Sequence, residues 1–233
     1  MPRLLPVMIC LAFGLSTAPA RAQDQIRFDV LFRGLSVAEI TLVARQTDAA
    51  YALAGQVRST GLAGVFARLR FQLQAEGVMA GAAPRPRRYA EDVDTGRRVS
   101  AVEVSFAGDA PQILRQTPAP GAEAVPPDAA TGTVDPLSAL WRVVRGGAAP
   151  CGWSMPVYDG ARLSELSLAP PTGGEILSCE GHYTRVAGFP PEDMAERRVF
   201  PFAATYAAQD GAFVLTEVAA MSLLGPIRIV RRD

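Results

Sequence analysis

The chain offers few side chains that could act as catalytic groups. Its 233 residues include a single histidine, His182, and no lysine. Without lysine, Walker-type phosphate loops, Ser–Lys dyads and Schiff-base chemistry are excluded, since each needs that amine. Ser36 lies in a Gly-Leu-Ser-Val-Ala run that only half matches a nucleophile elbow, and no motif fixes a nucleophile near His182. The sequence therefore predicts a non-enzyme in which His182 is a surface or partly buried strand residue.

Acidic residues occur at two predicted turns. The run Asp-Val-Asp-Thr-Gly at 92–96 faintly resembles a calcium loop, but the further oxygen ligands of such a loop are missing, which favours a hairpin turn. Asp159 and Arg162 are either a turn-stabilising pair or polar residues at a barrel mouth, and the turn is favoured unless both prove buried. We expect no metal site and no cofactor.

Two cysteines, Cys151 and Cys179, lie outside the N-terminal segment. No Cys-x-x-Cys motif is present, and two cysteines with one histidine do not fill a zinc site. Two thiols in an oxidising compartment usually pair. We predict a Cys151–Cys179 disulfide, with two separately buried thiols as the alternative.

A local basic cluster flanks the turn at 92–96, and its members are Arg85, Arg87, Arg88, Arg97 and Arg98. Such a cluster is usually a solvated hairpin face, and less often it binds an anionic head group or an acidic partner. We treat it as a candidate anion-binding rim.

Residues 1–22 have the features of a signal peptide. Arg3 precedes an apolar run from Leu4 to Leu15, and Ala20-Arg21-Ala22 has the small-x-small form of a cleavage site. The apolar run is shorter than the roughly 20 residues that a membrane span needs. Removing residues 1–22 takes away two arginines and no acid, which changes the formal net charge from 0 to −2. We therefore predict a periplasmic protein that does not span the membrane and does not bind nucleic acid.

The rest of the chain is dominated by strand patterns. Apolar and polar residues alternate in several segments, including 26–32, 38–44, 69–75 and 102–106. Asp159-Gly160 and Asp210-Gly211 are typical hairpin turns. A curved sheet with this alternation would line its concave side with Phe28, Phe32, Ile40, Leu42, Leu69, Phe71 and Leu73.

One segment has helical periodicity. Asp135 is a good N-cap, Pro136 suits the first helical position, and Gly146 suits the end. Leu137, Leu140, Trp141 and Val144 would share one apolar face, with Arg142 on the polar side. Before this helix, residues 117–133 are rich in Pro, Gly and Ala and predict an exposed connection rather than a domain boundary. We expect one domain, 23–233, with a many-stranded antiparallel β-sheet, curved or an incomplete barrel, and the helix packed on its concave side.

Several short motifs together resemble the DUF3108 family of exported bacterial proteins. They are Phe28-x-Val-x-x-x-Gly-Leu35, Thr60-Gly-Leu62, Asp135-Pro-Leu-Ser-Ala-Leu140, Val157-Tyr-Asp-Gly-Ala-Arg162 and a late strand with Cys179 and Tyr183. The resemblance extends over residues 26–231 and implies an envelope location, a mostly antiparallel β architecture and no assigned reaction.

Three function classes remain. The first is a periplasmic binding or scaffold protein that holds an apolar or lipid-like ligand, or a partner segment, on its concave face. The second is a structural interaction module for envelope integrity that uses only its outer surface, and the third, a hydrolase of envelope polymers, lacks an evident pair of carboxylates. Two carboxyl groups converging in a deep cleft would favour the third. For the first class, the predicted ligand-facing residues are Phe28, Phe32, Leu69, Phe71, Leu73 and Trp141.

Overall fold

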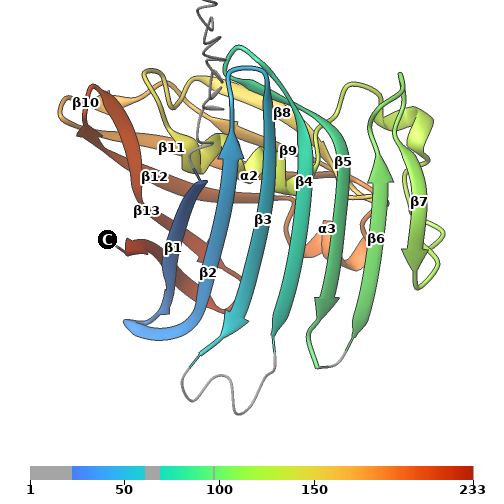
Figure 1. Ribbon diagram of the computed structural model, residues 1–233. Helices are drawn as coiled ribbons and strands as arrows, with labels where there is room; N and C mark the ends of the chain where they lie inside the picture. The colour runs from blue at the N-terminus through green and yellow to red at the C-terminus, as the bar shows by residue number, and fades with distance from the viewer. Residues whose placement is uncertain (1–22, 61–68, 97, 233) are drawn as a thin grey trace, which may run out of the picture.

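The computed structural model describes residues 23–60, 69–96 and 98–232, which form a mainly β protein (Figure 1). Its strands are β1 (Gln23–Phe32), β2 (Leu35–Gln46), β3 (Ala50–Ser59), β4 (Arg70–Ala80), β5 (Ala83–Asp94), β6 (Val99–Ser105), β7 (Gln112–Thr117), β8 (Trp153–Tyr158), β9 (Leu163–Leu168), β10 (Thr172–Gly173), β11 (Ile176–Ala187), β12 (Val199–Gln209), β13 (Ala212–Ser222) and β14 (Gly225–Arg232). The helical segments in this part of the chain are η1 (Pro127–Ala130), α2 (Pro136–Arg145) and α3 (Pro191–Glu196). The predicted mainly β class is confirmed; α3 was not predicted.

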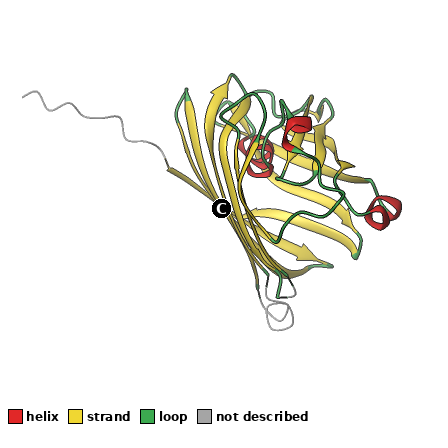
Figure 2. Cartoon of the chain, turned by 90° about the vertical axis from the view of Figure 1, so that its right-hand side faces the viewer, coloured by secondary structure: helices red, strands yellow, loops and turns green. Residues whose placement is uncertain are grey.

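All strands belong to one antiparallel sheet of 14 strands, in the order β7-β6-β5-β4-β3-β2-β1-β14-β13-β12-β11-β9-β8, with β10 paired only to β11. Strand β1 pairs with both β2 and β14, so the first and last strands lie side by side in the middle of the sheet. The edges β7 and β8 do not pair with each other, so the sheet is an incomplete barrel, as predicted. Figure 2 shows two leaves that meet along the middle strands, with a helix between them near one end.

Local turn chemistry explains the hairpins. Asp210 and Gly211 both have positive φ, at 50° and 79°, which is the conformation of a type I′ turn between β12 and β13. The run at 92–96 ends β5 and enters the hairpin turn to β6, in which the Gly96 N–H donates to Asp94 Oδ1 at 2.8 Å. At the β8–β9 turn, Asp159 Oδ1 accepts the N–H groups of Ala161 and Arg162. These predicted turns are confirmed.

Helix α2 begins and ends where the sequence predicts. The Ser138 N–H donates to Asp135 Oδ1 at 2.8 Å, and Gly146 closes the helix with φ of 60°. The helix lies against the sheet because Gly55 of β3 leaves room for it. A Cβ at Gly55 would lie 3.1 Å from Leu137 Cδ1. Trp141 is buried, and its indole N–H donates to Gln46 Oε1 at 3.1 Å.

Two residues of α2 are placed differently from the prediction. Leu140, expected in the core, is 40% exposed, whereas Arg142, expected on the polar side, is only 7% exposed. The helix contacts β3, β4, β5, β8 and β13 and is therefore surrounded by both leaves. A helix enclosed from several directions buries most of its circumference, so a single apolar stripe does not define its buried face.

The connection at 117–133 is anchored to the sheet rather than freely exposed. The Val125 N–H donates to the carbonyl of Ala161, and the Tyr158 hydroxyl donates to the carbonyl of Val125. Just beyond it, Val134 pairs with the outer edge of β8. The connection is exposed over much of its length, but Ala130 and Thr133 are buried. Val134, directly after the connection, therefore satisfies part of the edge that β8 presents.

Cys151 and Cys179 form a disulfide, with Cα atoms 6.3 Å apart. Cys179 lies on the inner face of β11 beside buried Leu177, while His182 is exposed on the opposite face. The bond therefore joins the segment that follows α2 to a late strand, as predicted.

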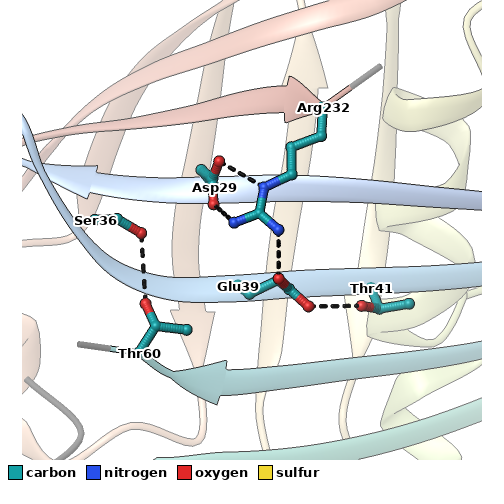
Figure 3. A network of polar contacts seen from close by, with 6 residues as sticks. All are labelled: Asp29, Ser36, Glu39, Thr41, Thr60 and Arg232. Carbon is teal, nitrogen blue, oxygen red and sulfur yellow. Dashed lines mark hydrogen bonds and ion pairs between the residues drawn. The ribbon is translucent and has the colours of Figure 1, made fainter.

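A polar network on the outer face joins the neighbouring strands β14, β1 and β2 (Figure 3). Arg232 of β14 binds Asp29 of β1 through two nitrogens and Glu39 of β2 through Nη1, at 2.6 Å. Thr41 donates to the other oxygen of Glu39. Because these side chains are solvent-accessible, we assign the network a role in strand register rather than a large share of the stability.

Candidate binding site on the concave face

The concave face is covered by α2 at one end and left partly open at the other. Strand register aligns Ala44, Leu53, Ala75, Tyr89 and Val104 in one row, and every member is buried in the core cluster that contains α2. A parallel row farther from the buried end contains Ile40, Val57, Phe71 and Val93, all of which remain partly exposed. The helix therefore covers only part of the apolar face.

The open part of the face contains a cavity of about 370 Å³, here called the interior cavity. Phe71 and Val93 line it from one leaf, Val157 and Tyr183 from the other, and Pro136 at the start of α2 lines it between the leaves. A second cavity of about 360 Å³ adjoins it beneath the connection at 117–124. Both volumes lie within the range of small-molecule sites, roughly 300–1,000 Å³.

The two cavities share a polar wall whose members are Glu91, Arg98, Ser100, Asp159 and Arg162. Glu91 accepts a hydrogen bond from the Tyr89 hydroxyl at 2.6 Å. Burial raises the pKa of Glu91, while Tyr89, Arg162 and Arg98 act in the opposite direction. Burial also raises the pKa of Tyr89. Glu91 is thus a partly shielded carboxyl group that Asp159 makes harder to ionise.

Asp159 and Arg162 both stabilise a turn and line the cavities between the leaves. Their charged groups lie 3.7 Å apart at the β8–β9 turn, with side chains that are only partly exposed. The backbone hydrogen bonds to Asp159 Oδ1 fix the turn, and both residues also line the two cavities. They are turn-stabilising residues at a cavity mouth.

The predicted ligand-facing residues divide into two groups. Phe28 and Trp141 are only 2% and 4% exposed and belong to the core, so both are wrongly assigned to a ligand surface. Phe71 lines the interior cavity, and Phe32, Leu69 and Leu73 are partly exposed. Phe28 differs from Phe71, although both belong to one register row, because Phe28 lies at the meeting of the two leaves.

The predicted arginine rim does not assemble. Arg85 is at the far end of β5 from Arg98, about 30 Å along an extended strand. Arg88 is on the outer face, where its guanidinium binds Glu103 at 2.7 Å, and Arg87 is exposed. Of the five, Arg98 reaches the interior cavity, and Arg97 lies outside the described residues. Strand length and side-chain alternation separate residues that are close in sequence.

Glu91 is the residue of this site that the sequence interpretation missed. Tyr89, Glu91 and Val93 alternate inward on β5, so a charged residue lies on an otherwise apolar face. That inward charge is visible in the sequence as a break in the alternation.

Within the described residues, no group of three or more His, Cys, Asp or Glu side chains could hold a metal ion, and no helix is long and apolar enough to cross a membrane.

Comparisons with known proteins show a family and a fold. Residues 27–205 match the family described as "Protein of unknown function (DUF3108)". The structure resembles the beta-barrel-like protein of the domain of unknown function DUF1849 from Brucella abortus, with a TM-score of 0.51 and 6% identity, covering 91% of this chain and 96% of that one. At this identity the likeness shows the fold alone. No curated protein matches the chain in sequence.

Proposed function

The chain belongs to the DUF3108 family, which has no assigned function, and we propose that it is a non-catalytic envelope protein that binds an apolar ligand in the interior cavity. The observation that carries this proposal is the incomplete cover of the concave face. Apolar side chains that share a face with the core remain partly exposed beside a cavity of about 370 Å³. Concave apolar surface of this kind is typical of ligand sites.

The polar wall supports binding of a ligand that is not wholly apolar. Glu91, Arg98, Asp159 and Arg162 bring two carboxyl groups and two guanidinium groups to one side of the cavity. In many binding proteins, a small number of convergent polar groups beside apolar walls fixes the orientation of the ligand. The apolar part of the ligand would contact Phe71 and Val93.

Titration with the neutral apolar dye Nile red tests the proposal. The protein without residues 1–22 should bind the dye saturably, and Phe71→Arg should weaken binding because it places a charge in the apolar wall. Gln72→Arg is the matched control, since Gln72 is exposed on the opposite face of the same strand. Unsaturable dye uptake, or equal binding by the Phe71→Arg variant, would contradict the proposal and favour an interaction module that uses only its outer surface.

We also propose a periplasmic location. The disulfide supports an oxidising compartment, and the predicted signal peptide, 1–22, lies outside the described residues. N-terminal sequencing of the protein from a periplasmic extract should give Gln23 as the first residue. A chain that starts at Met1 and fractionates with the cytoplasm would refute the location.

A hydrolase is a second candidate because Glu91 and Asp159 line the same two cavities. Two carboxyl groups that line one cavity are the arrangement of an acid–base pair. Asp159 is, however, already bound by two backbone N–H groups and by Arg162. Release of reducing ends from peptidoglycan or another envelope polysaccharide, abolished by Glu91→Gln, would establish this function over the first.

A further inference from the structure

A third cavity lies at the end of the molecule that α2 fills. Its volume is about 820 Å³, and the tips of the β4–β5 and β6–β7 hairpins, the residues before α2 and the start of β8 line it. We call it the seam cavity, because it lies between the leaf that ends at β7 and the leaf that ends at β8. It has no lining residue in common with the interior cavity.

Arg142 of α2 lines the seam cavity and is 93% buried, at 7% exposure. Its Nη2 donates to the carbonyl of Ala149 at 3.3 Å, and its guanidinium lies 5.3 Å from the ring centre of Trp153, which also lines the cavity. No carboxylate among the described residues is within ion-pair distance of it. One long hydrogen bond and one ring contact leave most of its donors without a strong acceptor.

A second arginine adds to the positive charge at this end of α2. Arg145 follows Arg142 by one turn, and its buried Nε has no hydrogen-bond partner. Burial lowers the pKa of Arg142, and the charge of Arg145 lowers it further. The carbonyl end of α2 offsets a part of this charge, about half an elementary charge at most. Buried guanidinium groups in proteins are normally paired with an anion, because burying an unpaired charge is costly.

The remaining walls of the cavity are largely apolar. They include Phe106, Val134, Trp153 and Met155, and the other charged lining residues are Arg85 and Asp109, one of each sign. An inorganic anion would leave these walls without contacts, whereas an apolar chain or ring would cover them.

We propose that the seam cavity is a binding site for an anionic amphiphile, whose carboxylate or phosphate binds Arg142 and whose apolar part lies against Phe106, Trp153 and Met155. The planar guanidinium can bind either head group through two parallel hydrogen bonds. This site is independent of the interior cavity and of the function proposed for it.

Isothermal titration of the protein without residues 1–22 tests this site with ligands of one chain length. The two anions are used below their micelle concentrations and dodecanol below its solubility limit. Dodecanoate and dodecyl phosphate should bind at least about tenfold more tightly than dodecanol, since a charge-assisted pair is worth more than 1.4 kcal/mol. Stronger binding of one anion identifies the head group. Equal binding of dodecanol, or no binding of either anion, would overturn the proposal. Equal affinity for inorganic phosphate and dodecyl phosphate would overturn the amphiphile assignment.

Variants separate this site from the interior cavity. Arg142→Gln should reduce anion affinity to that of dodecanol, and Arg142→Lys, which keeps the charge and serves if the Gln variant fails to fold, should lie between the two. Arg228→Gln is the charge-matched control, since Arg228 is exposed and bound to Glu217. Phe71→Gln, which lessens apolar contact in the interior cavity without adding a charge, should leave the preference for the anions over dodecanol unchanged. Full anion affinity in both folded Arg142 variants would show that Arg142 only supports the Ala149 loop and would refute the proposal.

Discussion

Asp135 shows how one residue of a sequence motif can support a whole helix. It is fully buried, and its carboxylate accepts both the N–H and the hydroxyl of Ser138, at 2.8 and 2.5 Å. The Ser138 oxygen lies 2.7 Å from the Tyr51 hydroxyl on β3. This chain of hydrogen bonds fixes the start of α2 to the sheet, which explains the Asp-Pro-Leu-Ser segment in physical terms.

The same residue gives a prediction about pH. Burial raises the pKa of Asp135 from 3.8 to about 6, so the folded protein binds this proton more tightly than the unfolded chain does. Its stabilising contribution is therefore fully present below about pH 4 and is lost as the pH rises through 6. Asp135→Asn, which keeps a good N-cap, should remove this part of the pH dependence. Urea unfolding at pH 4, 5, 6 and 7 measures how the free energy of unfolding depends on pH. The same dependence on pH in the Asp135→Asn variant would contradict the assignment.

At the scale of elements, α2 is the helix that fills one end of the incomplete barrel. Trp141→Asp should destabilise the protein by more than about 4 kcal/mol, because it places a charge in the core and removes the bond to Gln46. Leu140→Asp should cost less than about 1 kcal/mol, since Leu140 is 40% exposed. Denaturant midpoints of the two variants provide the comparison. Similar losses would show that the helix buries a different face.

These elements also show where sequence reasoning succeeds and where it fails. The strand alternation, the Asp210-Gly211 turn and the Asp135 to Gly146 helix are set by local periodicity and capping, so they were predicted correctly. The burial of Arg142 and the exposure of Leu140 depend on which distant strands surround the helix. The dispersal of the arginine cluster depends on the length and register of β5. Neither property is encoded within a short window of sequence.

For the whole molecule, the disulfide joins the segment after α2 to β11. The closed loop has a sequence separation of 28 residues, and the loop-entropy model gives a stabilisation of about 3–4 kcal/mol. Replacing both cysteines with alanine should lower the melting temperature by roughly 10 °C for a chain of this size. A calorimetric scan tests this, and an unchanged transition would mean that packing alone holds the two segments together.

The open sheet also accounts for the distribution of cavities. Edges β7 and β8 do not pair, and the helix covers one end of the space between the leaves. Cavities consequently remain at the seam and beneath the uncovered apolar face, with no lining residue common to the two. A closed small barrel would fill this space with its own side chains.

Photo-labelling with a dodecanol analogue that carries a diazirine tests the central claim, ligand binding in the interior cavity. Tandem mass spectrometry locates the labelled residues. We predict saturable labelling at Phe71 and Val93, which line the cavity, and not at Gln72 and Asp92, which are exposed on the opposite face of the same strands. Labelling that favours Gln72 and Asp92, or that rises without saturation at all four residues, would contradict the account.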